Sequence, residues 1–194
     1  MGFQITGAAV LLVFYGCYFG KMAAQRKKGI RTDQMGREKT GLERAVELAV
    51  KAAAWGVAAA EMVSIFLNTG IFASPVRSAG ALAAVLGTAV FIVSAATMED
   101  SWRAGVSKTE KTALVTRGVY QISRNPAFLG FDLLYIGVGV MFFNWMLFVL
   151  SVFAAVMLHT QIVKVEEPFL AETFGERYLA YRKRVCRYLG RKRR

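Results

Sequence analysis

The sequence predicts an all-α integral membrane protein with about five transmembrane helices and a C-terminal amphipathic helix at the membrane surface. Hydrophobic residues make up 55% of the 194 residues, and the mean hydropathy is +0.39. A soluble domain usually contains about 45–50% apolar residues. The apolar residues here form long blocks, and Lys and Arg gather in every second connection between the blocks. Both patterns are typical of a chain that crosses a bilayer several times.

Three apolar runs in the N-terminal half each predict one transmembrane helix. They cover about residues 3–22, 45–68 and 78–98. Each supplies the roughly 20 residues needed to cross a hydrocarbon core of about 30 Å, and each should be helical because lipid offers no partner to an open backbone. The first run has its basic residues after it rather than before it, so we expect a span and not a cleavable signal peptide.

Small residues are abundant in the second and third runs, which predicts close packing of these helices against their neighbours. Glu61 lies near the middle of the second run. A carboxylate at that depth is unfavourable and often functional. Two interpretations stay open for Glu61, a role in a site or pairing with a polar group on a neighbouring helix.

Two further runs, about 127–143 and 145–163, are separated only by Asn144 and predict a tight helical hairpin. The segment after them has one apolar face, because its apolar residues recur at spacings of three and four. The rest of its surface is basic, which is typical of a helix that lies on a membrane or caps a bundle. The final sequence RKRR is expected to contact anionic lipid. The apolar face comprises Leu170, Phe174, Tyr178, Tyr181, Val185 and Tyr188.

The charge distribution predicts the orientation. Segments 21–41, 99–126 and 164–194 carry seven, five and ten Lys or Arg residues, whereas the opposite connections carry only Arg77. Such positive segments stay in the cytoplasm, so we expect an external N-terminus and a cytoplasmic C-terminus in the cytoplasmic membrane. The formal charge of +12 is then a consequence of topology. No nucleic acid and no obligate protein partner is expected, only membrane lipids and a substrate.

Polar residues of chemical interest gather in residues 99–126 and 159–182, both on the predicted cytoplasmic side. A helical hairpin brings its two ends together, so these stretches should meet. Taken singly, each residue has a structural explanation; Arg124, for example, can anchor a helix end at the headgroups. The residues expected to meet are Arg124, Asn125, Pro126, His159, Lys164, Glu166 and Glu167.

Metal ligands are not grouped in the sequence. The chain has one histidine, His159, and two cysteines, Cys17 and Cys186. Metal sites need several such ligands at close spacing, so no metal is expected. Both cysteines are expected to remain reduced.

The two polar stretches contain motifs in a fixed order. GVYQISRNPAFLG (118–130) precedes the apolar hairpin, and EEPFLAETFGERYLAYRKRV (166–185) follows it. This order resembles the C-terminal half of the isoprenylcysteine carboxyl methyltransferase family and the related phospholipid methyltransferases. Their pattern is Gly-x-Tyr, Arg-His-Pro-x-Tyr-x-Gly, an apolar hairpin, Glu-Glu and Phe-Gly-x-x-Tyr-x-x-Tyr. The resemblance covers about residues 112–188.

The resemblance implies transfer of a methyl group from S-adenosylmethionine (SAM) to a membrane-borne acceptor, most like a prenylcysteine carboxylate, with S-adenosylhomocysteine as product. It also implies that residues 1–98 form three N-terminal spans with a basic loop, and that residues 99–194 form the catalytic region. Carried over by position, the catalytic residues are Arg124, Glu166 and Glu167. The cofactor-binding residues are Thr112, Ala113, Leu114, Val115, Tyr120, Asn125, Pro126, Ala127, Phe128 and Glu167.

The sequence departs from the family pattern at three places. Asn125 stands where the family has histidine, and Phe128 where it has tyrosine. Asparagine does not titrate near neutral pH, so proton transfer at this position is not essential to an active protein. The arginine expected a few residues before Glu-Glu is absent, and His159 or Lys164 is the candidate to replace it. A carboxylate acceptor has a pKa of about 3.3–3.7 and needs no base, so the missing histidine favours it over an amine.

Four alternatives stay open. A phospholipid N-methyltransferase would need a base for its amine acceptor, and Glu166, Glu167 or His159 would supply it. A membrane reductase of the sterol-reductase type shares a related layout and would use a nicotinamide cofactor. A transporter should show an internal repeat and broken helices, which this sequence does not show, and a scaffold has no need of clustered polar motifs. Saturable SAM binding separates the methyltransferases from the other readings.

Overall fold

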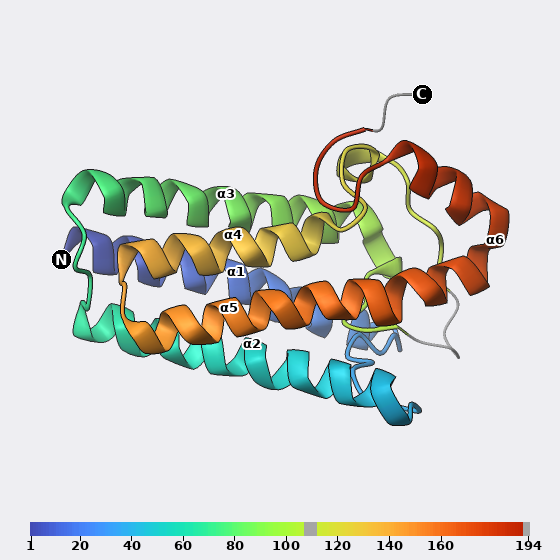
Figure 1. The fold of residues 1–194 in the computed structure, drawn as a ribbon, viewed down its shortest axis with the longest axis horizontal. Coiled ribbons are helices and arrows are strands. Elements are labelled where there is room, and N and C mark those ends of the chain that lie inside the picture. Colours follow the sequence, from blue (N-terminus) through green and yellow to red (C-terminus); the bar gives the residue numbers. More distant parts are fainter. Residues whose placement is uncertain (107–111, 192–194) are drawn as a thin grey trace.

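Five helices lie roughly side by side along the long axis of the molecule, and a sixth extends beyond their ends (Figure 1). The computed structural model describes residues 1–106 and 112–191. Lys108, Lys111 and residues 192–194, which belong to the predicted basic segments, lie outside them. The elements are α1 (Gly2–Lys27), α2 (Gly41–Leu67), α3 (Ser74–Met98), η1 (Glu99–Ser101), η2 (Gly118–Gln121), α4 (Pro126–Met141), α5 (Trp145–Gln161), η3 (Ile162–Glu166) and α6 (Glu167–Arg184).

Four helical runs are long and apolar enough to cross a membrane by length and composition, and α4 is a shorter apolar helix. The four runs are α1, α2, Ser74–Ser101 and Trp145–Arg184. The last run has 40 residues, or about 60 Å at 1.5 Å per residue, twice the thickness of the hydrocarbon core. Its apolar part is α5, so η3 and α6 lie beyond the span. The predicted all-α membrane fold is confirmed.

Helices α3 and α4 approach closely enough for their backbones to touch. A Cβ added to Gly130 would lie 2.9 Å from the carbonyl oxygen of Gly87, and one added to Gly80 would lie 2.8 Å from that of Gly137. Side chains larger than hydrogen would therefore separate the two helices. The close packing predicted for the third apolar run is confirmed, and its partner is α4.

Asn144 forms the turn of the predicted hairpin between α4 and α5. Its side-chain oxygen accepts a hydrogen bond from the backbone N–H of Leu147 at 2.9 Å, which caps α5. Its amide nitrogen donates to Ser64 Oγ at 2.7 Å and to Thr69 Oγ1 at 3.2 Å. The turn is thereby tied to the end of α2, along which α5 packs.

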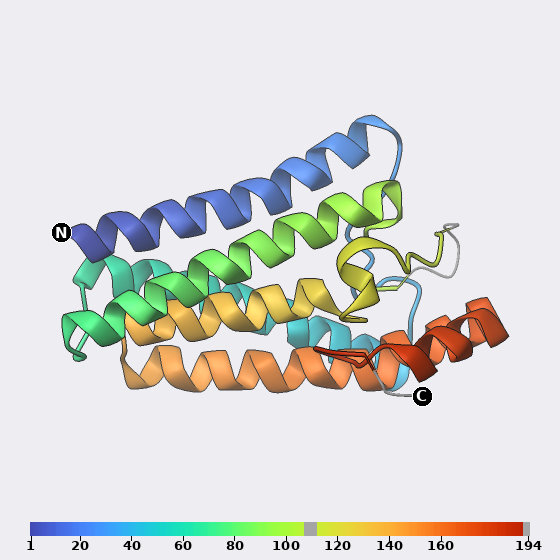
Figure 2. The same ribbon diagram turned by 90° about the horizontal axis from the view of Figure 1, so that it is seen from above.

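Helices α5 and α6 form one continuous run, joined through the π-helical segment η3 (Figure 2). Pro168 follows this segment directly. A proline ring inside an α-helix clashes with the carbonyl four residues earlier, here that of Lys164, and a wider π turn relieves such a contact. The sequence predicted a separate amphipathic helix after the last apolar run, whereas in the structure α6 continues from α5 through this wider segment.

The C-terminal helix is shorter than predicted. It bends at Gly175, where φ is 51° and ψ is −131°, and it ends at Arg184. Val185 and Tyr188, predicted on its apolar face, lie in a segment that folds back, with an antiparallel bridge between Val185 and Arg191. Of the predicted face, Tyr178, Tyr181 and Val185 are buried, with Leu170 and Phe174 packed against them.

A buried ion pair holds the loops at the end of the bundle opposite the N-terminus. Lys39 Nζ lies 2.5 Å from Glu47 Oε1, and both side chains are almost fully buried. Glu47 also accepts the backbone N–H groups of Gly36 at 2.6 Å and Val106 at 3.4 Å. The loop after α1 is therefore fixed to the segment after η1.

Glu61 is fully buried in α2. Neither of its carboxyl oxygens has a hydrogen-bond partner among the described residues. Glu61 also does not line either of the two chambers at the loop end of the bundle, which are described below. Among the described residues, Glu61 thus has no hydrogen bond to a neighbouring helix and no place on these two chamber walls.

Candidate functional site

Two adjoining chambers lie where the helix ends meet the loops. The first, here the loop chamber, encloses about 940 Å³ of empty space, counting the part open to solvent. The second, the bundle chamber, encloses about 970 Å³ on the same measure.

The loop chamber is built from the segments flanking η1 and η2, the start of α4, and α6. Its wall consists of Met98, Ser101, Trp102, Arg103, Gly105, Val106, Thr112, Ala113, Leu114, Val115, Tyr120, Arg124, Asn125, Ala127, Phe128, Glu166, Phe169, Leu170, Phe174, Tyr178 and Tyr181.

The bundle chamber lies among the transmembrane helices. Its wall consists of Tyr15, Tyr18, Phe19, Met22, Asp33, Met35, Val50, Lys51, Ala54, Trp55, Ala58, Phe91, Trp102, Arg103, Ala104, Gly105, Ala127, Phe128, Phe131, Tyr135, Leu158, Gln161 and Glu166. Most of these side chains are apolar. An ion pair of 2.5 Å between Lys51 and Asp33 stands at its loop end.

Among the described residues, six line both chambers, and we call them the shared wall. Molecules bound in the two chambers would meet there. Only two members of the shared wall are charged, Arg103 and Glu166. The shared wall comprises Trp102, Arg103, Gly105, Ala127, Phe128 and Glu166.

Glu167 is committed to a charge cluster behind the loop chamber. Its Oε1 lies 2.9 Å from Arg124 Nη1 and 2.8 Å from Arg187 Nε, and its Oε2 accepts from Arg187 Nη2 at 3.0 Å. Burial alone would raise the pKa of Glu167, but the hydrogen bond from Arg187 and the charge of Arg124 outweigh it and the pKa is lowered. Glu167 is therefore a stable carboxylate with all its partners in the protein.

Glu166, its neighbour, faces the chambers instead. Burial raises the pKa of Glu166 to about 7, against a weaker opposing effect from the Gln161 hydrogen bond. That bond runs from Gln161 Nε2 to Glu166 Oε1 at 3.0 Å. The Glu166 carboxyl, which lies on the shared wall, therefore changes its protonation state near neutral pH.

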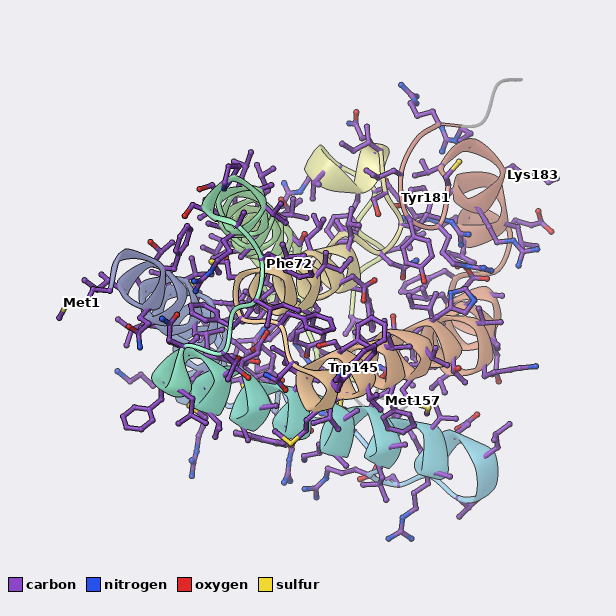
Figure 3. All side chains as sticks on the ribbon, turned by 60° about the vertical axis from the view of Figure 1, so that its left-hand side comes forward. Met1, Phe72, Trp145, Met157, Tyr181 and Lys183 are labelled. Carbon is purple, nitrogen blue, oxygen red and sulfur yellow. The ribbon has the colours of Figure 1, made fainter. Side chains whose placement is uncertain are left out.

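Two tyrosines attach α6 to the loop that precedes α4. Tyr181 points from α6 toward this loop, whereas Lys183 lies on the outer side of the helix (Figure 3). The Tyr181 hydroxyl donates to the carbonyl of Tyr120 at 2.6 Å. Arg124 donates to the Tyr178 hydroxyl at 2.8 Å. These bonds close the loop chamber on its α6 side.

Asn125 holds the returning C-terminal segment. Its side-chain amide donates to the carbonyl of Arg187 at 3.1 Å, and its backbone N–H donates to the same oxygen at 3.2 Å. An amide makes these bonds at any pH. This position of the chain therefore contributes geometry to the loop chamber and no titrating group.

The structure brings together most of the residues predicted from the sequence. Pro126 begins α4 behind the loop chamber, and Glu167 also lies outside its wall. The predicted residues on the wall are Thr112, Ala113, Leu114, Val115, Tyr120, Arg124, Asn125, Ala127, Phe128 and Glu166.

His159 and Lys164, the candidates for the missing arginine, line neither chamber. His159 is exposed and its Nδ1 lies 2.6 Å from the Tyr188 hydroxyl. Lys164 is exposed as well. The basic residue on the shared wall is Arg103, which no motif singled out. Its place depends on long-range backbone bonds between Ala104 and the loop after α1, which a linear pattern does not reveal.

The two chambers differ in the ligands that they suit. The loop chamber is rich in aromatic faces, which attract cations, and it contains the Glu166 carboxyl. It suits a cationic, water-soluble molecule. The bundle chamber, with its apolar walls, suits an extended apolar chain that enters from the lipid.

Residues 75–177 match the family model described as phospholipid methyltransferase, over just more than half of the chain. The match runs from the start of α3 into α6. Curated relatives also align. A protein-S-isoprenylcysteine O-methyltransferase of Saccharomyces cerevisiae is 31% identical over 109 residues, which are 55% of this chain and 45% of the relative.

Two further relatives bear the same kind of name. Protein-S-isoprenylcysteine O-methyltransferase B of Arabidopsis thaliana is 32% identical over 80 residues, covering 41% of each chain. The protein-S-isoprenylcysteine O-methyltransferase of Xenopus laevis is 35% identical over 78 residues, 40% of this chain and 27% of the relative. The matched part of this chain thus spans less than half the length of each of these relatives.

Proposed function

This chain belongs to the phospholipid methyltransferase family, and from that membership we propose that it is a membrane-embedded methyltransferase. The proposed reaction transfers a methyl group from SAM to the carboxylate of a prenylcysteine and releases S-adenosylhomocysteine. The relatives named as isoprenylcysteine O-methyltransferases support this acceptor. The observation that carries the proposal is the shared wall between an aromatic-lined chamber that faces the loops and a more apolar one among the helices.

The loop chamber is the proposed site of the methyl donor. SAM supplies an activated methyl group on a sulfonium cation. The residues present fit such a molecule, because Tyr120, Phe128 and Tyr178 offer aromatic faces that attract a cation. Ionised Glu166 adds a negative charge beside them. The predicted lining residues 112–115 supply backbone groups for the rest of the molecule.

The bundle chamber is the proposed site of the acceptor's lipid chain. An acceptor carboxylate has a pKa of about 3.3–3.7 and is already nucleophilic at pH 7. The protein then needs to align the acceptor with the donor, and such positioning contributes as much as about 7–11 kcal/mol. Asn125, which does not titrate, is consistent with a reaction that needs no base.

We further propose that the site faces the cytoplasm. The chambers lie at the end of the bundle that carries the basic segments, including the loop after α1 and the segment beyond α6. Residues 99–194 supply most of the donor site. Residues 1–98 supply much of the acceptor site through α1 and α2, as well as three spans.

Phospholipid N-methylation is the second candidate. The name of the matching family favours it, and so does Glu166, whose pKa of about 7 suits a general base for an amine. The two candidates share the donor site and differ in the acceptor.

Methyl transfer from radiolabelled SAM by the detergent-purified protein tests the proposal. S-farnesylcysteine and phosphatidylethanolamine are offered in parallel to the wild type, to Glu166→Gln and to Glu172→Gln, a matched change at an exposed position of α6. We expect base-labile label on the cysteine compound in the wild type and in Glu172→Gln, reduced at least tenfold in Glu166→Gln. Label in the lipid would support the second candidate. No transfer to either acceptor, with no SAM binding by calorimetry, would contradict both.

A further inference from the structure

The shared wall is where an acceptor atom must meet the methyl donor, if the proposed function is correct. Of its two charged members, Glu166 is acidic and Arg103 is basic. A carboxylate brought to a wall with only Glu166 would meet a like charge, which disfavours binding. A basic group on the same wall offsets that repulsion.

Arg103 is held in place by its own chain segment. Its Nη1 donates to the carbonyls of Asp100 at 2.6 Å and Trp102 at 2.9 Å. These two bonds fix the plane of a guanidinium that has five N–H donors in all. The side chain is half-buried, so its charge acts where water screens it less than at the surface.

The segment that carries Arg103 is itself anchored on both sides. The Ala104 N–H donates to the carbonyl of Thr32 at 3.0 Å, and the Gln34 N–H donates to the carbonyl of Ala104 at 2.9 Å. Gln25 Nε2 donates to the carbonyl of Trp102 at 3.0 Å. Such support from buried neighbours is what a binding group needs to hold its geometry.

The other cations on the chamber walls are placed differently. Arg124 lines the loop chamber only, and Lys51 lines the bundle chamber only. Arg103 is the described cation that lines both. A planar guanidinium also matches the two oxygens of a carboxylate.

We propose that Arg103 binds the carboxylate of the lipid-linked acceptor at the shared wall, and so selects acids over neutral acceptors. This inference rests on the proposed function and deepens it. Arg103 would hold the acceptor oxygens against the donor while the apolar chain lies in the bundle chamber. The residue thereby sets acceptor specificity.

A matched pair of ligands tests it. S-farnesylcysteine and its carboxamide differ in one group, which is charged in the first and neutral in the second. Their affinities are measured by competition with the wild type, Arg103→Gln, Arg103→Lys and the control Arg177→Gln, an exposed arginine of α6. SAM affinity is measured in the same samples.

We expect the wild type and Arg177→Gln to bind the acid at least tenfold more tightly than the amide. In Arg103→Gln the ratio should fall below twofold, with SAM affinity within twofold of the wild type. An unchanged ratio would overturn the inference. A selective loss of SAM affinity would also overturn it, because the guanidinium would then serve the donor's own carboxylate.

Arg103→Lys covers the case in which Arg103→Gln does not fold, since it keeps the charge and loses the planar fork. Its acid affinity should fall at least threefold and its amide affinity should not change; equal changes in both would overturn the inference. Failure of the proposed function gives a different result, since the wild type would then neither bind SAM nor transfer a methyl group. A wild type that methylates only phosphatidylethanolamine would also overturn the role of Arg103.

Discussion

At the residue scale, the adjacent carboxyls of Glu166 and Glu167 have opposite environments. Glu167 lies between Arg124 and Arg187, with a lowered pKa, whereas Glu166 lies on the shared wall with a pKa raised to about 7. Successive helical residues point about 100° apart, so two adjacent side chains can face different surroundings. Glu167 secures α6, and Glu166 lines both chambers.

The raised pKa of Glu166 predicts pH-dependent binding of the donor. A sulfonium cation favours the ionised carboxyl, so affinity should rise as pH rises through about 7 and level off above it. We expect SAM to bind about tenfold more weakly at pH 6 than at pH 8. Calorimetry at the two pH values measures the ratio.

Glu166→Gln is the variant that checks the cause. It should bind SAM with the same affinity at both pH values, whereas Glu172→Gln should keep the tenfold ratio. A ratio that persists in Glu166→Gln would assign the pH dependence to another group.

The resemblance assigned both carboxyls a catalytic role and cofactor binding to Glu167, whereas the structure directs Glu166 toward the shared wall and Glu167 away from it. The directions in which these two side chains point depend on the π turn of η3, because its extra residue rotates the start of α6 about the helix axis. No local sequence motif predicts that turn. Arg103 was missed for a related reason. Its position comes from backbone bonds to residues about 70 positions earlier in the chain.

At the element scale, the contact between α3 and α4 fixes the position of α4. The start of α4 carries Ala127 and Phe128 of the shared wall. Glycines supply the closest points of this contact. Gly137 lies against Ala84 and Gly80 on α3, and Gly130 against Gly87. Packing of this kind stabilises the protein because the two helix backbones make van der Waals contacts along much of their length.

Gly137→Ala tests this contact. The added Cβ would meet the backbone nitrogen of Ala84, which belongs to another helix and has no room to move. Overpacking of this kind typically lowers the free energy of unfolding by about 1–3 kcal/mol. Thermal unfolding in detergent should show a lower midpoint, together with weaker SAM binding.

Gly139→Ala provides a control on the same helix, since nothing lies within 4 Å of its added Cβ. Alanine is the better helix former by about 1 kcal/mol, so this variant should be as stable as the wild type or more so. Equal destabilisation in both variants would contradict a packing role for Gly137.

Composition predicted that the third helix would pack closely, and it did not identify the partner. Glycines at matching positions on two helices become a contact only when the topology places them opposite each other. The bend at Gly175 was missed as well, because the apolar residues keep their helical spacing across it. Periodicity reports which side chains share a face, and it is insensitive to a single residue with positive φ.

At the scale of the whole molecule, hydropathy and charge carried most of the information. The apolar runs predicted the number and order of the helices, and Asn144 predicted the hairpin, because lipid restricts the backbone to helices. The chambers could not be predicted in the same way. Their walls combine residues from helices α1–α5, the loops and α6.

Orientation in the membrane is the prediction that belongs to this scale. In a variant with Cys17 and Cys186 replaced by alanine, one new cysteine is placed at Ser74 or at Glu172, both exposed and at opposite ends of the bundle. An impermeant maleimide should label Ser74→Cys in intact cells and Glu172→Cys only after permeabilisation. The reverse pattern would place the chambers outside the cell.

The charge cluster of Arg124, Glu167 and Arg187 also bears on how the protein is made. Glu167 joins residues on either side of the α5–α6 run, and Arg187 is its last partner to leave the ribosome. Helices α1–α5 are synthesised before that residue. The complete cluster can therefore form only after α1–α6 have all been synthesised. If the loop chamber is the donor site, as proposed, this cluster secures its α6 side only when synthesis of the chain is nearly complete.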